Sequence, residues 1–434
     1  MLETDMNQNL PKIALLSQST SQQWISCQTI YRNLVQAYTS IFKDSELYQF
    51  QLSPNYSNYE AHNTAKEIIS KNVEKIVFVD YAPHPEKFIK ILNEIRPKQL
   101  PELIFHIYGD FVLQVSSWLK IENELKNFKV KFICASHRQA KLLESFICNT
   151  KVEVVPFPVD ENQFYFSTDL RKKTRDTMFI KDDETICFYS GRLSLQKNVL
   201  PLIRAFSFFQ KHVSPESKLI LAGPIDDLGI PYLSKKSPPG IMNFDIQSII
   251  HNVFPNEKNC PIHYLGNLTS ENLNAIYNAS DLFISLSGHN DEDFGMAPAE
   301  ALMTGCYSIL SDWGGYSSFK KYVPELVSLV PVQIGTSVSP TQHDIIKSMT
   351  VAPTDYSIQK RTKQALIAKN SLSISNIEKM LSINIQKAAE NFQGFSELFR
   401  QLQRNLNLRP DAPFKSTNGY SQLYKEVYHV YINS

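Results

Sequence analysis

The sequence predicts an α/β protein made of two similar domains, each built on a mostly parallel sheet. At 434 residues the chain is too long for one ordinary hydrophobic core, so two domains are expected. Short apolar runs recur without the alternation of a half-exposed sheet, which indicates strands buried on both faces. Helix-like stretches separate these runs, and the series restarts after a polar break. This order is typical of parallel sheets with crossover helices.

The first series of runs predicts the strands of an N-terminal domain. They lie at residues 12–16, 75–80, 103–108, 131–134 and 152–155, and helices are expected at 24–38, 85–95 and 137–146. Residues 159–183 are polar and charge-rich, and they follow Pro156 and Pro158. Such a composition shift favours a domain boundary, which we place near Phe164. The first domain is therefore expected at residues 1–163.

The second series predicts a second domain of the same type at residues 164–409. Its strands are expected at 185–190, 218–222, 262–265, 282–286, 306–310 and 327–332, and a short helix at 244–252. The segment 335–375 matches no element that we can place. Residues 377–406 have helical periodicity with a break expected at Gly394, and 420–431 reads as a final helix. The tail 410–434 is expected to return to the first domain.

Composition and charge exclude several classes of function. The chain is 43% hydrophobic and 20% charged with a net charge of +1, so no global field recruits nucleic acid. The six cysteines form no CxxC motif, which favours free thiols in a reducing compartment over disulfides or a zinc site. No apolar run approaches the ~18 residues of a membrane span. We expect a cytoplasmic protein, with peripheral membrane contact and oligomeric state left open.

A cationic motif follows the first expected strand of the second domain. Gly191 would let the backbone approach a ligand closely, and Arg192 offers a planar fork of donors that suits phosphate. Lys197 adds a mobile charge just before a helix that Asn198 could cap. Together the two cations could neutralise a diphosphate without a metal. The alternative interpretation is that Arg192 and Lys197 are two unrelated cations in a solvated loop.

Two glutamates eight positions apart form a second motif. Pro298 suits a first helical turn, which places Glu300 near the third helical position. A carboxylate there could simply stabilise the helix dipole, or it could accept hydrogen bonds from the two hydroxyls of a ribose. Glu292 lies in the preceding loop, free to reach sugar hydroxyls. The amides of Gly295, Met296 and Ala297 would be the free donors of a helix start, which suits an anion.

This stretch resembles a known family. Glu292 and Glu300, set in EDFGMAPAEALMTG, resemble the E-x7-E signature of retaining family-4 glycosyltransferases with the GT-B fold. The neighbouring motifs keep that family's order: Gly191-Arg192-Leu193 with Lys197-Asn198, residues 219–223, Tyr264-Leu265-Gly266 and Gly314-Gly315. The match covers roughly residues 185 to 320, and several ordered motifs are more specific than any single one.

The resemblance implies a fold and a set of roles. The fold would be GT-B, two Rossmann-like domains facing across a cleft, with the acceptor on the first domain and the nucleotide sugar on the second. Arg192 and Lys197 would hold the donor diphosphate, Glu300 the ribose and Glu292 the transferred sugar. His106, at the end of a first-domain strand, would lie near the sugar and acceptor, although a lone histidine there is often structural.

The function implied is that of a metal-independent retaining glycosyltransferase of the hexosyl type. It would need no cofactor beyond its nucleotide-sugar donor, with a UDP-sugar as the leading candidate, and its acceptor would be a hydroxyl of a glycan, protein or lipid. One departure supports an alternative: the loop 17–23 lacks the glycine pair that the family often uses at the diphosphate. The alternative is a non-catalytic GT-B subunit that stabilises a partner glycosyltransferase. An epimerase or phosphorylase of the same fold is a weaker competitor.

Overall fold

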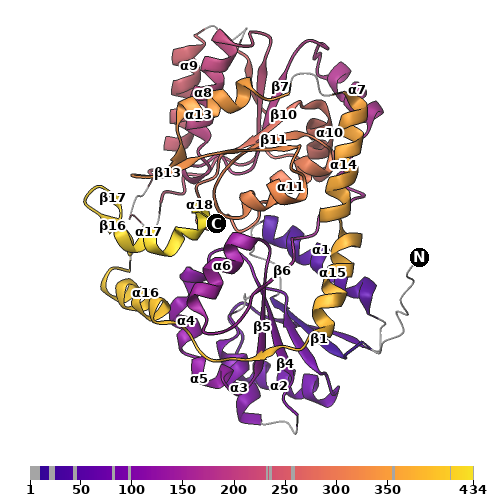
Figure 1. Ribbon diagram of the computed structural model, residues 1–434, viewed down its shortest axis with the longest axis vertical. Helices are drawn as coiled ribbons and strands as arrows, with labels where there is room; N and C mark the ends of the chain where they lie inside the picture. Colours follow the sequence, from indigo (N-terminus) through magenta and orange to yellow (C-terminus); the bar gives the residue numbers. More distant parts are fainter. Residues whose placement is uncertain are drawn as a thin grey trace. The chain divides into compact units, whose positions relative to one another are not determined.

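The chain forms two compact units in the computed structural model (Figure 1). The structure describes residues 10–18, 25–42, 46–80, 84–95, 99–230, 233, 237–255, 260–353, 357–410 and 412–433. Unit 1 comprises Met1–Pro158 with Ile374–Arg404, and unit 2 comprises Val159–Ser373 with Asn405–Ser434. Both are α/β units.

A sheet in the order β15-β5-β4-β3-β1-β2 forms the centre of unit 1, and β6 pairs with β5. All pairings are parallel except that of β15 with β5. The strands are β1 (Ile13–Gln18), β2 (Leu47–Leu52), β3 (Lys75–Phe78), β4 (Glu102–Ile107), β5 (Lys129–Cys134), β6 (Glu153–Val154) and β15 (Glu390–Asn391). Strands β3, β4 and β5 are buried almost throughout, as their unbroken apolar runs predict.

Helices of unit 1 connect these strands. They are α1 (Ile25–Ile41), α2 (Asn58–Ser70), α3 (Glu86–Ile95), α4 (Val115–Leu119), α5 (Glu122–Leu125) and α6 (His137–Phe146), with a 3₁₀ turn at Phe111–Gln114. Helix α15 (Ile374–Gln386) joins them from far along the chain and packs on α1. The buried ammonium of Lys131 donates to the carbonyls of Asn384 and Lys387 at the end of α15, at 2.6 and 2.7 Å. A cation at these carbonyls satisfies groups that the helix leaves unpaired.

Unit 2 is built on a parallel sheet in the order β12-β11-β10-β7-β8-β9. The strands are β7 (Ile186–Ser190), β8 (Lys218–Ala222), β9 (Ile262–Tyr264), β10 (Leu282–Ser285), β11 (Tyr307–Ser311) and β12 (Val327–Val330). Within unit 2, the first strand along the chain is β7, in the middle of the sheet, and β8 and β9 follow on one side of it. Strands β10, β11 and β12 then follow on the other side. The strand order therefore reverses between β7 and β10.

Helices and short hairpins complete unit 2. The helices are α7 (Thr168–Thr177), α8 (Val199–His212), α9 (Ile241–Val253), α10 (Ser270–Ala279), α11 (Met296–Met303), α12 (Phe319–Tyr322), α13 (Gln342–Thr350) and α14 (Ile358–Leu372). The hairpins are β13 (Val332–Ile334) with β14 (Val338–Pro340), and β16 (Lys415–Ser416) with β17 (Gly419–Tyr420). Helix α16 (Glu397–Leu408) starts in unit 1 and ends in unit 2, where α17 (Gln422–Tyr428) and α18 (Val430–Asn433) follow.

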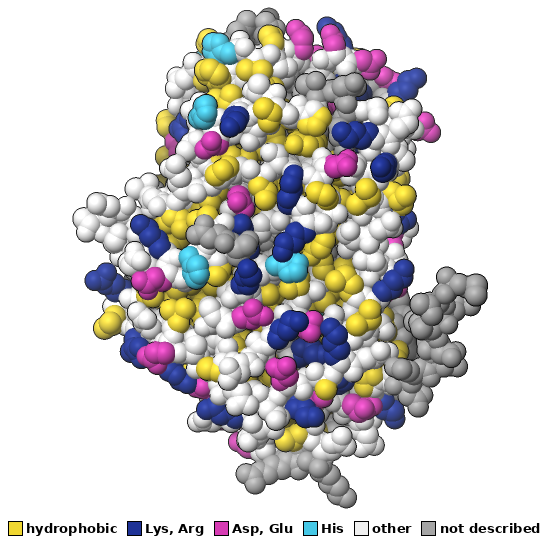
Figure 2. All heavy atoms as spheres, viewed as in Figure 1, with side chains coloured by type: hydrophobic (Ala, Val, Ile, Leu, Met, Phe, Trp, Pro, Cys, Tyr) yellow, Lys and Arg dark blue, Asp and Glu magenta, His cyan; other side chains and the backbone are white. Residues whose placement is uncertain are grey.

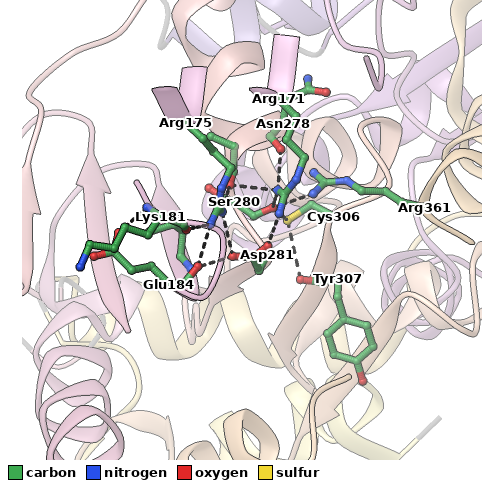
Figure 3. A network of polar contacts seen from close by, with 12 residues as sticks. Arg171, Arg175, Lys181, Glu184, Asn278, Ser280, Asp281, Cys306, Tyr307 and Arg361 are labelled. Atoms are coloured by element: carbon green, nitrogen blue, oxygen red, sulfur yellow. Dashed lines mark hydrogen bonds and ion pairs between the residues drawn. The ribbon is translucent and has the colours of Figure 1, made fainter. Parts of the chain in front are cut away.

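Three arginines fix the start of β10 in unit 2 (Figure 3). Arg171 and Arg175 of α7 both donate to the carbonyl of Ala279 at 3.0 Å, and both form ion pairs with Asp281. Arg361 of α14 donates to the carbonyl of Ser280 at 2.7 Å. These carbonyls lie at the end of α10, where a helix favours positive charge. The network explains why the charge-rich stretch 159–183 contains a helix, whereas the sequence indicated only a polar break.

The division into units differs from the sequence prediction in two places. The boundary falls between Pro158 and Val159, just before the predicted Phe164. The segment that rejoins the first unit is Ile374–Arg404, whereas the tail 410–434, expected there, groups with unit 2. The periodic stretch 377–406 is two helices, and Gly394, with φ of +116°, lies in the break between them. The unassigned stretch 335–375 contains all of α13 and α14.

Surface charge is mixed, as the net charge of +1 implies. On the face drawn in Figure 2, Lys and Arg side chains are interspersed with Asp and Glu side chains. Within the described ranges, no helix is both long enough and apolar enough to cross a membrane.

Candidate active site

The candidate site lies at the carboxyl ends of β7 and β10, the two adjacent strands of unit 2 between which the strand order reverses. Loops that follow such neighbouring strands diverge, and the crevice between them is the usual ligand site of an open α/β sheet. Gly191 follows β7 directly, and the loop 287–293 follows β10. Both sequence motifs therefore meet at the place where this type of fold binds ligands.

Gly191 and Gly223 allow the ends of β7 and β8 to approach closely. Gly191 has φ of +144° and Gly223 has φ of +124°, a region that favours glycine. A Cβ atom on Gly223 would lie 2.0 Å from the carbonyl oxygen of Gly191. Hydrogen bonds from the Gly191 amide to Ala222 at 3.0 Å and from Gly223 to Gly266 at 2.8 Å fix the two loops. The backbone at Gly191 is thus left without a side chain at the mouth of the sheet.

Each cation of the first motif is paired with a carboxylate. The Arg192 guanidinium donates to Asp226 Oδ2 at 2.7 Å, and the Lys197 ammonium donates to Glu292 Oε2. Burial acts to raise the pKa of Glu292, but the charge and hydrogen bond of Lys197, a hydrogen bond from Ser287 and the charge of Arg192 lower it overall. Glu292 is 7% exposed, so an ionised carboxylate here depends on its cation.

Asn198 anchors the loops rather than capping the helix. Its backbone is left-handed, with φ of +53°, and it makes no side-chain cap on α8. Instead its Nδ2 donates to the carbonyls of Leu286 at 2.7 Å and Val338 at 2.8 Å. The predicted capping role is therefore wrong. Asn198 ties the end of the Lys197 turn to the end of β10.

The loop 287–293 is held by its own backbone and side chains. The Gly288 amide donates to Gln196 at 2.9 Å, which attaches the loop to the Lys197 turn. His289 Nδ1 accepts from the Asp291 amide at 2.8 Å, so the imidazole proton lies on Nε2. Burial, Lys197 and Arg192 together hold the pKa of His289 well below its usual range. His289 is therefore a neutral side chain beside the two cations.

Glu300 lies on α11, half-buried, and pairs with a tyrosine. Its Oε2 accepts from the Tyr277 hydroxyl of α10 at 3.1 Å. Burial raises the pKa of Glu300 to about 8, and the hydrogen bond from Tyr277 opposes this only in part. The sequence predicted a place near the third residue of the helix. Helix α11 begins at Met296, however, so Glu300 is its fifth residue. That position weakens the explanation by helix dipole, which acts mainly within the first turn.

The start of α11 fits the expected donor set for an anion. Gly295 is the N-cap residue and makes no side-chain cap, so it does not cover the helix start. Met296 and Ala297 form the first turn together with Pro298, which confirms the proline's expected place. These amides point out of the helix start at its positive end.

His106 belongs to unit 1, on β4, and its ring packs edge-on against Tyr38 of α1. Its Nε2 lies 2.7 Å from the Tyr38 hydroxyl of α1, and the side chain is 2% exposed. Burial lowers the pKa of His106 to about 3, so the ring is neutral. This geometry suits the structural alternative, and a role of His106 beside sugar and acceptor stays a prediction. Residues 19–23 of the other first-domain feature, the loop 17–23, lie outside the described residues.

Sequence reasoning missed Asp226 and Tyr277, the partners of Arg192 and Glu300. Asp226 is 34 residues from Arg192, and Tyr277 is 23 residues from Glu300. Neither belongs to a motif, and only the sheet order brings them to the site. The signal that could have found Asp226 is its position just after β8, since strand ends of a parallel sheet meet at one edge.

We expect Asp226→Asn to strengthen binding of a diphosphate. Asparagine can still accept the hydrogen bond from Arg192, but it no longer neutralises the guanidinium. Loss of a partly exposed pair of this kind changes the free energy of binding by ~1 kcal/mol, or about fivefold in affinity. Calorimetric titration with UDP measures the effect, and Asp245→Asn on α9 is the control for the change in net charge. Weaker binding would mean that Asp226 acts mainly to anchor Arg192.

We also expect the affinity for UDP to rise with pH. Burial gives Glu300 a pKa of about 8, so it holds its proton below that pH, whereas hydroxyl donors bind best to the ionised form. Ligand binding must therefore release this proton below pH 8, so affinity should increase from pH 7 towards pH 8 and level off above it. Folding stability has the opposite pH dependence: because the folded state raises the pKa of Glu300, its burial costs more stability as pH rises from about 4.5 to about 8. A titration series from pH 7 to 9 tests this, and Glu300→Gln should remove the slope.

Comparison with known proteins supports a glycosyltransferase domain in this part of the chain. Residues 171–321 match the family model described as Glycosyl transferases group 1. The chain is 24% identical over 235 residues to the lipopolysaccharide 1,2-N-acetylglucosaminetransferase of Salmonella typhimurium, covering 53% of this chain and 54% of that protein. It is 24% identical over 192 residues to an uncharacterized glycosyltransferase of Methanocaldococcus jannaschii, covering 42% and 43%. The chain spans about half the length of the curated relatives it matches.

Solved structures resemble this chain in fold over most of its length. Anabaena HepE in complex with UDP has a TM-score of 0.62 at 14% identity, covering 86% of this chain and 99% of that one. Sucrose-phosphate synthase from Thermosynechococcus elongatus has a TM-score of 0.56 at 15% identity, covering 90% and 99%. At such identities the likeness shows the fold. It confirms the predicted GT-B fold, α/β with parallel sheets in two domains.

Proposed function

The chain carries a glycosyltransferase group 1 domain at residues 171–321, and from this premise we propose that it is a metal-independent retaining glycosyltransferase. It moves a sugar of the hexose type from a nucleotide-sugar donor, a UDP-sugar as the first candidate, to a hydroxyl acceptor. The observation that carries the proposal is the meeting of Arg192, Lys197 and Glu292 at the strand-order reversal of unit 2. A HepE structure similar in fold contains UDP-glucose, which supports this choice of donor.

The two cations would stabilise the departing diphosphate. Charge builds up on the leaving group as the sugar–phosphate bond breaks, and fixed cations lower the energy of that state. In the structure both cations have carboxylate partners. A diphosphate would therefore enter by exchange: Arg192 would leave Asp226, and Lys197 would leave Glu292. This exchange frees the Glu292 carboxylate for the sugar hydroxyls at the same moment.

Glu300 would bind the ribose. A carboxylate can accept hydrogen bonds from two neighbouring hydroxyls, and one of its oxygens already has Tyr277 as a donor. The amides at the start of α11 would bind a phosphate oxygen. Attack by the acceptor from the side of the leaving group, within an ion pair, would retain the anomeric configuration. No residue is assigned as a covalent nucleophile.

The test is a panel of UDP-, GDP- and ADP-sugars, with EDTA present to exclude metal. We expect the sugars of one nucleotide (UDP, GDP or ADP) to raise the Tm of the protein. We also expect the protein to release the nucleotide slowly from one of these nucleotide sugars. The anomeric configuration of the released or transferred sugar, followed by NMR, tests retention. Turnover only after metal is restored would contradict metal independence. If no nucleotide sugar of the panel gives thermal stabilisation or turnover, the result favours the alternative, a non-catalytic subunit that stabilises a partner.

A further inference from the structure

The C-terminal segment of unit 2 ends in a column of buried aromatic rings. Its members are Phe414, Tyr420, Tyr424, Tyr428 and Tyr431, which we call the tyrosine column. All are buried, and Tyr424, Tyr428 and Tyr431 are 0% exposed. Ring centroids are 3.7 Å apart for Tyr420 and Tyr424, 4.6 Å for Tyr424 and Tyr428, and 5.5 Å for Tyr428 and Tyr431. Tyr424, Tyr428 and Tyr431 lie on α17 and α18, drawn in yellow in Figure 1, and their spacing of four and three residues places them on one face.

The tyrosine column contacts the loop that carries Glu292. The Tyr424 hydroxyl donates to Asn290 Oδ1 at 3.0 Å, two residues before Glu292. The Tyr431 ring packs edge-on against Trp313 with centroids 5.3 Å apart. Trp313 in turn donates its indole proton to the carbonyl of His289 at 2.9 Å. Two independent paths thus run from the column to the loop 287–293.

A glycine turn is fitted between the column and Glu292. The Gly315 amide donates to the carbonyl of Glu292 at 2.9 Å. A Cβ atom on Gly314 would lie 2.5 Å from that carbonyl oxygen and 3.3 Å from the Tyr431 ring. The layers are therefore packed without spare space, and interiors packed in this way transmit small displacements. A shift of Tyr431 would move the backbone of Glu292.

We propose that Tyr424 and Tyr431 are positioning residues of the donor site, acting through Asn290, Trp313 and Gly314 on Glu292. The inference rests on the proposed function, because only that function makes the loop 287–293 part of a donor site. The tyrosine column reaches the loop and the turn at the ligand edge of the sheet, and one of its contacts is a hydrogen bond to a buried amide. Packing alone would need only the rings. The hydrogen bond from the Tyr424 hydroxyl would, in addition, fix the position of Asn290 and therefore of the loop 287–293.

The decisive variant is Tyr424→Phe, which keeps the ring and removes the hydroxyl. Asn290 is 4% exposed, so its amide oxygen would be left buried and unpaired. We expect about tenfold weaker binding of UDP by calorimetric titration. Asn290→Ala should weaken binding to a similar extent, and the double variant should be no worse than the weaker-binding single variant. The matched control is Tyr307→Phe on β11, whose hydroxyl is hydrogen-bonded to Ser328.

Amide hydrogen exchange gives a readout that needs no ligand. Tyr424→Phe should speed exchange in peptides that cover residues 287–295 and leave β7 and β8 unchanged, whereas Tyr307→Phe should leave 287–295 unchanged. Additive effects in the double variant, or UDP binding equal to wild type, would overturn the proposal. If the wild type binds no nucleotide of the panel, the proposed function fails. Hydrogen exchange then decides alone: unchanged exchange at 287–295 overturns the positioning role, and faster exchange there supports it.

Discussion

Lys197→Ala is expected to lower the rate of sugar release from the donor by about 100- to 1,000-fold, the range seen when one preorganised stabilising group is lost. Two causes add. The departing diphosphate loses a cation, and Glu292, 7% exposed, loses the ammonium that lowers its pKa. A buried carboxylate without its partner takes up a proton or moves towards water. Either change removes it from the sugar hydroxyls that it would bind. Release of nucleotide from the donor found in the panel measures the effect.

Lys218→Ala provides a matched control for Lys197→Ala. Lys218 pairs with Glu184 at 2.8 Å in the same unit, and the side-chain exposures, 29% and 7%, resemble the 19% and 9% of Lys197 and Glu292. Lys218 lies at the start of β8, at the other end of the sheet from the site. Its loss should change stability but leave the release rate close to wild type. Equal losses of rate in both variants would mean that the effect of Lys197 is only structural.

Glu300→Ala is expected to weaken UDP binding by about 10- to 100-fold, because hydrogen bonds to a charged group contribute about 1.5–3 kcal/mol. The loss should appear in the affinity more than in the rate at saturation, since the ribose is remote from the bond that breaks. Arg192→Ala should show the reverse, a lower rate with a smaller change in affinity. Calorimetric titration and saturation kinetics separate the two.

The control for Glu300→Ala is Glu325→Ala, which removes an exposed carboxylate that accepts a hydrogen bond from Gln364 in the same unit. It should bind UDP as the wild type does. Unchanged binding in Glu300→Ala, or equal and small effects of Glu300→Ala and Arg192→Ala, would contradict the assignment of the site.

The buried strands could be predicted because burial on both faces of the sheet requires an unbroken run of apolar residues. Strand β2 was missed for the opposite reason. It lies at the edge of its sheet, and its residues are mostly half-exposed, so Leu47–Leu52 shows no apolar run. Helix α7 was missed because its arginines bind carbonyls at the end of α10 rather than solvent. The sequence shows their charge but not their partners.

The candidate site divides in the same way. Glu292, Arg192 and Lys197 could be predicted because each follows a strand of a parallel sheet, at the edge where such sheets bind ligands. The pairings Arg192–Asp226 and Lys197–Glu292 depend on the order of strands in the sheet, which local sequence does not contain. The role of Asn198 was mistaken because a helix cap is the commonest use of asparagine before a helix. Its left-handed backbone directs the side chain to two other loops instead.

The return of Ile374–Arg404 to the first unit has a consequence for biosynthesis. Strand β5 receives its partner β15 only when residues 390–391 have been made, and Lys131 receives its carbonyl acceptors only with residues 384 and 387. A chain that emerges N-terminus first must therefore wait, with one sheet edge and one buried ammonium unpaired, while some two hundred residues of the other unit are translated. Ribosome-bound chains that end near residue 370 should then be the ones most dependent on chaperones. Premature termination in that region would yield a polypeptide with neither unit complete.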